Sequence, residues 1–242
     1  GRDYKMTAAA YLYNLTGDMK YENDMVAECV VKDGKTMLDQ SDKCCQYWGA
    51  AAYLMCAKNK VQPIHYPVLL TNMKSSLLNE AFVKHLTPLA DRPSRRCSDD
   101  AYGWFQTIQS LNALIISHAV CDDPAEKLKM VDAMTLEADW GLGRNPMNMV
   151  QMTGLGSRHA DDIYTSGRND GTPGVHPGHT PYMNANNWGS GYMADPQWYA
   201  AKGYPTWDKW PHGEALWRAR YCYSNNEFTP QQSMRGKMAL LA

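Results

Sequence analysis

Two similar Ala-rich runs occur near the start of the sequence. Residues 7–15 and residues 48–54 each carry three successive alanines followed by Tyr and Leu. The runs lie about 40 residues apart, which is the length of one helical hairpin. Small alanine faces allow antiparallel helices to approach closely. This repeat predicts a chain that is mainly helical, with its helices paired in hairpins.

Several helix boundaries can be predicted from residue types. The helix over residues 7–15 is expected to stop before Gly17, because glycine suits the left-handed conformation that ends many helices. A second helix is predicted over residues 21–31. Asp123 and Pro124 have the residue types of a helix cap and of a first helical position, so another helix is expected to begin there.

Helical spacing of apolar residues marks the middle of the chain, and a capping pattern marks its end. A last helix is predicted from Thr229 onward, where Gln232 completes a capping box and Pro230 occupies the first helical position. No convincing strand pattern of alternating apolar residues accompanies these helices. The apolar residues at helical spacing are Phe105, Ile108, Leu111 and Ile115, continued after the cap by Leu128, Val131 and Met134.

The sequence changes character after Gly141. Residues 141–211 contain most of the chain's glycine and proline and have almost no helical period. A long irregular segment in a compact domain usually carries function, because loops present binding and catalytic groups on a rigid scaffold. We therefore expect the functional residues here and in the loop that precedes the last helix.

Composition excludes some classes of partner. The net charge is -1, which provides no electrostatic footprint for nucleic acid or for an acidic membrane. No apolar stretch is long enough to span a bilayer. The 15 Tyr and 8 Trp against 3 Phe fit either a sugar-binding cleft or a hydrated helical core, because Tyr and Trp combine a flat apolar face with a polar edge. The 7 cysteines show no CxxC arrangement.

Four motifs, at residues 8–21, 141–156, 173–178 and 226–228, occur in an order that resembles that of glycoside hydrolase family 9. Residues 8–21 are similar to the "AAAELYxxTGDxxY" hairpins of that family. Residues 141–146, with 153–156 shortly after, are similar to its "LGxNP…TGxG" segment. Residues 173–178 resemble its "PGxLxGGPN" loop, and residues 226–228 resemble its "NE" element. Each motif is modest alone, and their common order makes the resemblance fairly specific.

The resemblance implies an all-α fold, namely the C-terminal portion of an (α/α)6 toroid of six helical hairpins, with long irregular loops. Residues 1–242 are then a partial catalytic domain. The family's catalytic base lies in an Asp-rich motif near the N-terminus of the domain, and no such motif is found here. The sequence opens at Gly1 without an initiator Met, which reads as the middle of a longer protein. Alone, the chain is expected to be inactive.

The implied activity is inverting hydrolysis of β-1,4-linked glucan, such as cellulose or related oligosaccharides, outside the cytoplasm (extracellular or periplasmic). Inversion requires one carboxyl group that donates a proton and a second that activates water. In the "NE" element, Glu227 is the predicted general acid. No cofactor is expected. The carboxylates of the long loop are compatible with a structural calcium ion. The predicted substrate-binding residues are Arg158, His159, Tyr164, Tyr102, Trp104 and Asn226.

Two alternatives use the same sequence differently. His159, Asp161, His176 and His179 are residue types that bind metal ions, so the long loop could belong to a metal-dependent hydrolase. The helical H-E-x-x-H spacing of many zinc hydrolases is not present in the sequence. A non-catalytic carbohydrate-binding fragment is the other alternative, since a single carboxyl group cannot support inverting hydrolysis.

Overall fold

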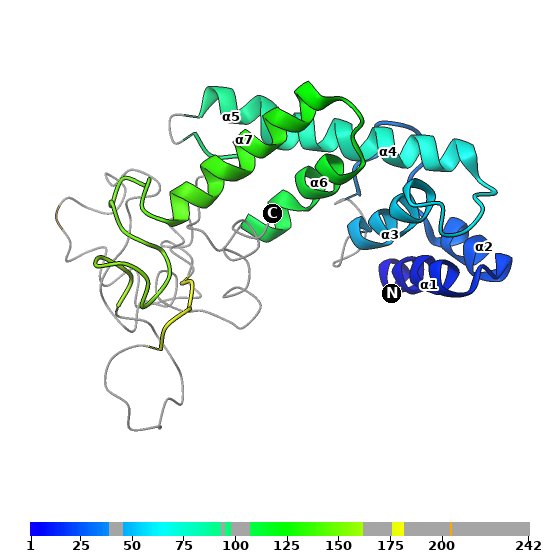
Figure 1. Cartoon of the computed structure of the whole chain (residues 1–242), viewed down its shortest axis with the longest axis horizontal. Coiled ribbons are helices and arrows are strands. Elements are labelled where there is room, and N and C mark those ends of the chain that lie inside the picture. The colour runs from blue at the N-terminus through cyan, green and yellow to red at the C-terminus, as the bar shows by residue number, and fades with distance from the viewer. Residues whose placement is uncertain (39–45, 93–94, 98–106, 162–175, 182–203, 205–242) are drawn as a thin grey trace. The chain divides into compact units, whose positions relative to one another are not determined.

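A computed structural model describes residues 1–38, 46–92, 95–97, 107–161, 176–181 and 204. These residues are mainly helical and include no strand, although Val150 and His159 form an isolated parallel bridge. Figure 1 shows the order and course of the helices. They are α1 (Arg2–Thr16), α2 (Met19–Glu28), α3 (Tyr47–Lys58), α4 (Pro67–Ala81), the π-helical turn η2 (Phe82–Leu86), α5 (Thr87–Asp91), α6 (Thr107–Val120) and α7 (Pro124–Gly141).

The chain divides into two compact units. The first comprises Gly1–Pro88 and Asn112–Val131, and the second comprises Leu89–Leu111 and Asp132–Ala242. Helices α6 and α7 contribute residues to both units. That residues 1–242 make up one partial catalytic domain stays a prediction.

The predicted hairpin repeat is present in the first unit. Helix α1 packs against α2 and also against α3, beside which it lies in Figure 1. Gly49 makes the contact between α1 and α3 close, because a Cβ atom at Gly49 would lie 2.2 Å from the Met6 sulfur and 3.2 Å from Thr7 Cα. The α1–α2 turn follows the prediction for Gly17, which ends α1 in the left-handed conformation at φ 67°.

The second helix lies earlier in the chain than predicted, since α2 begins at Met19 rather than at residue 21. Helix α2 ends at Glu28 rather than at residue 31, and Cys29 is already extended. Side chains from elsewhere take up the carbonyl oxygens at this end. Arg2 Nε donates to Glu28 O at 2.7 Å, and Gln46 Nε2 donates to the same oxygen at 2.8 Å. Such long-range capture of helix-end carbonyl groups cannot be read from local spacing.

Helix α7 begins where the sequence predicted. Pro124 is its first residue, and the Asp123 carboxylate accepts from the backbone nitrogen atoms of Ala125 and Glu126 at 2.8 and 3.3 Å. Helix α6 covers the predicted spacing of Ile108, Leu111 and Ile115. Phe105 and the helix predicted from Thr229 lie outside the described residues.

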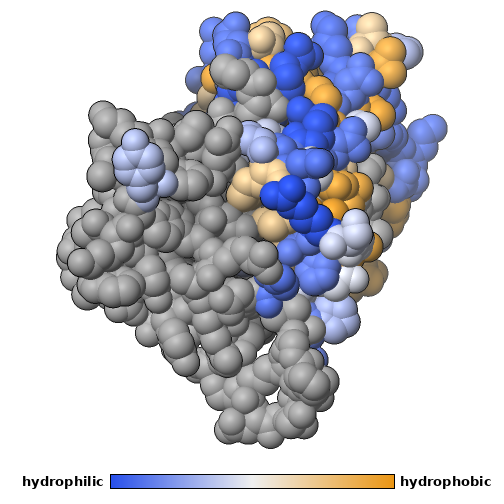
Figure 2. Space-filling model, turned by 90° about the vertical axis from the view of Figure 1, so that its left-hand side faces the viewer, coloured by the Kyte–Doolittle hydropathy of each residue, from blue (hydrophilic) through white to orange (hydrophobic). Residues whose placement is uncertain are grey.

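The described surface is mixed in character. On the face drawn in Figure 2, hydrophilic and hydrophobic residues are interspersed over the coloured part. None of the described helices combines the length and apolar composition needed to cross a membrane. Scattered apolar side chains on such a surface are ordinary.

Candidate functional site

The candidate site is the irregular region that follows α7. We use "post-α7 loop" for residues 142–161 together with residues 176–181, which all belong to the second unit. The described part of this region contains no helix. It carries Arg158 and His159, two of the predicted substrate-binding residues.

Asn145 fixes the start of the post-α7 loop against the end of α7. Its buried side-chain amide donates to the carbonyl oxygens of Trp140 and Met149, both at 2.7 Å. Its Oδ1 accepts from the Met149 backbone nitrogen at 3.3 Å. Asparagine suits this position because it offers two donors and an acceptor to buried backbone groups that need partners. Residues 143–146 are therefore fixed against the end of α7 by buried hydrogen bonds.

A cluster of charged and aromatic side chains, which is buried except for the exposed Arg144, supports the same helix end. The Arg96 guanidinium lies 4.9 Å from the centroid of a Trp140 ring, and the Arg144 guanidinium lies 5.9 Å from it. Arg96 and Glu137 are both completely buried and form an ion pair, with Arg96 Nη2 2.6 Å from Glu137 Oε1. Arg144 also donates to the Arg95 carbonyl oxygen at 3.1 Å. The desolvated contacts among Arg96, Glu137 and Trp140 hold the last turn of α7 in one geometry.

Arg158 and His159 lie on a short bridged turn. The Val150 nitrogen donates to Arg158 O at 2.9 Å, and the Ala160 nitrogen donates to Val150 O at 3.3 Å. His159 Nδ1 lies 3.0 Å from the Ala160 carbonyl oxygen, which can only accept, so Nδ1 carries the proton and Nε2 of the neutral ring accepts. Arg158 is exposed and His159 is half-buried. Both residues can therefore offer polar atoms to a ligand.

Thr153 joins the two parts of the post-α7 loop. Its hydroxyl donates to the His176 carbonyl oxygen at 2.5 Å and accepts from the His179 backbone nitrogen at 2.9 Å. Gly154 has φ +73°, and a Cβ there would lie 2.7 Å from Pro177 Cβ. The close approach of the two loop segments thus requires glycine at position 154, and the Thr153 hydroxyl joins the segments. The sequence marked Thr153 and Gly154 only as motif positions and did not predict this contact.

The structure gives the metal-hydrolase alternative no ligand set. The His176 and His179 rings meet edge to face at 6.3 Å between centroids. Within the described part of the chain, no three His, Cys, Asp or Glu side chains are grouped so that they could hold a metal ion. The other described members of the predicted set, His159 and Asp161, are therefore not gathered into such a group.

Glu227, Asn226, Tyr164, Tyr102 and Trp104 all lie outside the described residues. Their roles stay predictions.

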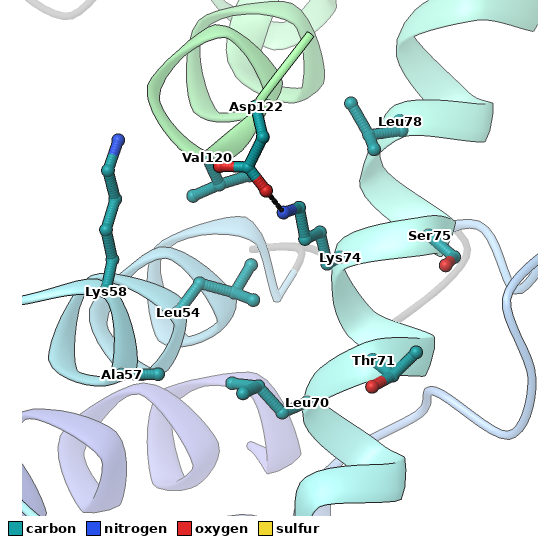
Figure 3. Close-up of a pocket in the computed structure, with 10 residues that line it drawn as sticks. All are labelled: Leu54, Ala57, Lys58, Leu70, Thr71, Lys74, Ser75, Leu78, Val120 and Asp122. Atoms are coloured by element: carbon teal, nitrogen blue, oxygen red, sulfur yellow. Dashed lines mark hydrogen bonds and ion pairs between the residues drawn. The ribbon is translucent and has the colours of Figure 1, made fainter.

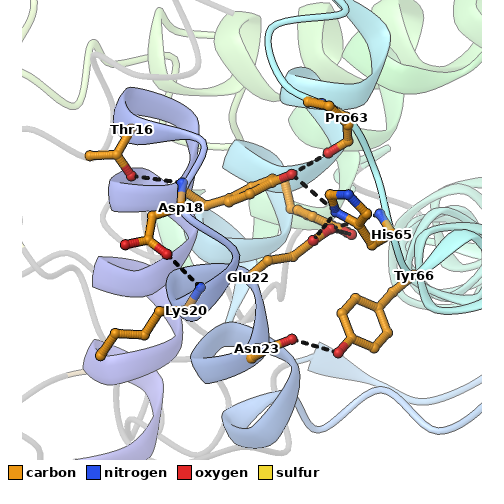
Figure 4. Close-up of polar contacts among 10 residues, drawn as sticks. Thr16, Asp18, Lys20, Glu22, Asn23, Pro63, His65 and Tyr66 are labelled. Atoms are coloured by element: carbon orange, nitrogen blue, oxygen red, sulfur yellow. Dashed lines mark hydrogen bonds and ion pairs between the residues drawn. The ribbon is translucent and has the colours of Figure 1, made fainter.

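The first unit contains a second polar cluster, drawn in Figure 4. The completely buried Glu22 carboxylate accepts from the Tyr53 hydroxyl at 2.6 Å and from the His65 backbone nitrogen at 3.0 Å. His65 Nδ1 lies 2.6 Å from its other oxygen. The Tyr13 hydroxyl donates to the Pro63 carbonyl oxygen. Burial and the bond to Glu22 raise the pKa of the Tyr53 hydroxyl. This cluster ties α2 to α3 and to the loop before α4.

The same unit has a pocket of about 530 Å³ between α3 and α4, beside Val120 (Figure 3). Its walls include Leu54 and Leu78, and the ion pair between Lys74 Nζ and Asp122 Oδ2 lies at 2.5 Å beside it. No aromatic side chain is present among its described lining residues. It therefore lacks the flat faces on which sugar rings stack.

Comparison with solved structures shows the fold. The chain is 19% identical to a single-mutant thermostable endoglucanase from Alicyclobacillus acidocaldarius, with a TM-score of 0.68. It is also 19% identical to AaCel9A in complex with a cellobiose-like isofagomine, with a TM-score of 0.66. Both matches cover 99% of this chain and 43% of the other. The chain thus spans less than half the length of these proteins, and the prediction of an all-α portion of an (α/α)6 toroid is confirmed.

Comparison at the level of families is more specific. Among curated proteins, none matches the chain. The model of glycosyl hydrolase family 9 matches residues 1–204, which include the hairpin repeat, α7 and the whole post-α7 loop. Since this match covers most of the sequence, the chain belongs to glycosyl hydrolase family 9.

Proposed function

We propose that the chain is part of an enzyme that hydrolyses β-1,4-linked glucan with inversion at the anomeric carbon. The family match over residues 1–204 is the observation that carries this proposal. Inverting hydrolysis requires two carboxyl groups and a water molecule, so we propose no cofactor. Because the resemblance is to enzymes that cleave cellulose-type glucan, we propose that this enzyme acts outside the cytoplasm.

Glu227 is the proposed general acid. It must hold a proton near the working pH and donate it to the glycosidic oxygen as the bond breaks. The N-terminus of the predicted following helix favours the ionised form, so a second carboxylate nearby has to offset that effect. We propose the catalytic base of the family, whose Asp-rich motif is not found in residues 1–242, as the source of this negative charge.

Arg158 and His159 are the proposed ligands of the substrate hydroxyl groups. The exposed Arg158 can donate several hydrogen bonds, and His159 Nε2 can accept one while Nδ1 is engaged by Ala160. The bridge at Val150 holds both residues, and Asn145 anchors that bridge to α7. Polar groups that are already held in place bind a sugar without the loss of entropy that ordering a loop would cause.

The remaining assignments rest on the sequence. We propose that Tyr102, Trp104, Tyr164 and Asn226 contribute to the same glucan-binding cleft. Tyrosine and tryptophan offer faces for sugar stacking, and asparagine offers both a donor and an acceptor.

Substitution of the proposed acid tests the mechanism. In the complete enzyme, Glu227→Gln is expected to lower the turnover number on cello-oligosaccharides by about 10²-fold or more, because glutamine cannot donate a proton to the leaving oxygen. Initial rates of reducing-end release measure this effect.

A matched substitution controls for the change of charge. Glu126 is a surface residue whose carboxylate pairs with Lys129 at 2.7 Å. Glu126→Gln should leave turnover unchanged. Normal turnover in the Glu227→Gln enzyme would remove the assignment of Glu227 as the acid.

A further inference from the structure

The pocket between α3 and α4 is a candidate site for a ligand other than a sugar. Its volume of about 530 Å³ lies in the range of small-molecule pockets, and all of its lining residues belong to the first unit. Its aliphatic lining residues are Leu54, Ala57, Leu70, Leu78 and Val120. A saturated hydrocarbon chain matches such walls, because burying methylene groups against them removes apolar surface from water.

The aliphatic walls come from both helices and from the end of α6. In Figure 3, Leu54 of α3 and Leu70 of α4 extend into the space between the two helices, and Val120 adjoins this space. Leu54 and Val120 are buried, at 4% exposure each, whereas Leu70 is half-buried. The pocket therefore combines a desolvated interior with a side that a ligand can reach from solvent.

The charged lining residues are Lys58, Lys74 and Asp122. Lys74 pairs with Asp122, and its hydrogen bond and charge lower the pKa of the Asp122 carboxyl, which the charge of Lys58 lowers further. Lys58 Nζ donates to the Ala119 carbonyl oxygen, a neutral group, so this bond does not balance its charge. The lining residues thus carry one more positive charge than negative charge.

The carboxylates that follow Asp122 in the chain are engaged at the start of α7. Asp123 accepts from the backbone nitrogen atoms of Ala125 and Glu126 at 2.8 and 3.3 Å. The Glu126 carboxylate pairs with Lys129 at 2.7 Å. These contacts commit both carboxylates to α7, so the excess positive charge at the pocket favours an anionic ligand.

We propose that this pocket binds an alkyl carboxylate, with its hydrocarbon chain between Leu54 and Leu70 and its carboxylate at the Lys58 ammonium group. Lys58 is exposed, so the carboxylate stays partly hydrated while the chain is buried. This site belongs to the first unit, whereas the post-α7 loop belongs to the second. The proposal does not depend on the proposed hydrolase activity.

Isothermal titration calorimetry of the complete enzyme with sodium decanoate, kept below its micelle-forming concentration, tests the proposal. Saturable binding is expected. Each buried methylene group should tighten binding by about fourfold, so hexanoate should bind at least about tenfold more weakly. Decyltrimethylammonium, which has the same chain and the opposite charge, should bind about tenfold more weakly. No saturable binding of decanoate, equal affinity for the cation, or displacement of decanoate by a cello-oligosaccharide would overturn the proposal.

Substitutions locate the bound decanoate. Lys58→Gln removes the charge and should weaken binding by about fivefold, whereas Lys58→Arg keeps it and should stay within about twofold of the wild-type enzyme. Leu70→Trp fills the pocket and should weaken binding by about tenfold or more. Lys20→Gln, at an exposed lysine that pairs with Asp24 on α2, is the matched control and should have no effect. Circular dichroism checks that each variant is folded, and unchanged affinity in a folded Lys58→Gln or Leu70→Trp enzyme would refute the proposal.

Discussion

At the scale of single residues, Asn145 makes a specific prediction about stability. Its amide satisfies buried backbone groups of Trp140 and Met149. Asn145→Ala removes the side-chain partner of both backbone groups of Met149, while Trp140 O still accepts from the Gly143 nitrogen at 3.3 Å. The free energy of unfolding of the complete enzyme should therefore fall by about 1–3 kcal/mol. Urea titration measures the change. Asn23→Ala removes an exposed hydrogen bond to Tyr66 and should cost less. Equal losses in the two variants would contradict the role assigned to Asn145.

The sequence could indicate these residues but not their contacts. Asn145, Thr153 and Gly154 lie in family motifs, and the described part of the segment that follows α7 is irregular, as the sequence predicted. The partners of Thr153 are the backbone groups of His176 and His179, more than 20 residues away in the chain. Residue types do not indicate which backbone groups a side chain bonds, so the link between the two loop segments could be found only from the structure.

At the scale of elements, the hydrogen bond between Tyr53 and Glu22 makes α2–α3 packing dependent on pH. Burial raises the pKa of the Tyr53 hydroxyl above its ordinary value of 10.0. A group whose pKa is raised by folding contributes stability below its unfolded pKa and loses it as the pH rises. The free energy lost on Tyr53→Phe should therefore be largest near pH 7 and shrink above pH 10.

Urea titration of the wild-type protein and of Tyr53→Phe, each at pH 7 and at about pH 10.5, measures how the free energy lost on substitution changes with pH. Tyr66→Phe is the matched control at pH 7, because its hydroxyl donates to the exposed Asn23. This control should cost less than Tyr53→Phe. A cost of Tyr53→Phe that stays constant between the two pH values would contradict the account of the α2–α3 contact.

Element boundaries followed local signals where those signals were strong. Gly17 ends α1 and Asp123 begins α7, as their residue types predict. The end of α2 was predicted too late, because Arg2 and Gln46 capture its terminal carbonyl oxygen from a distance. The helical pairing itself was predictable from the repeat of alanines alone.

At the scale of the whole molecule, the chain is expected to be unstable when it is produced alone. The chain spans 43% of the solved endoglucanases, and α1 exposes an apolar face. Such a face lowers stability and favours association. We expect the chain produced alone to unfold broadly and with little cooperativity on heating, as followed by circular dichroism. A sharp, cooperative transition of the isolated chain would contradict this expectation.

The central claim is that the complete enzyme hydrolyses β-1,4-glucan with inversion. Proton NMR of the first products released from a cello-oligosaccharide reads the configuration at the new reducing end before it equilibrates. Inversion predicts the α-anomer as the initial product, since water attacks the face opposite the leaving group. Initial release of the β-anomer, or no cleavage of the oligosaccharide, would contradict the claim.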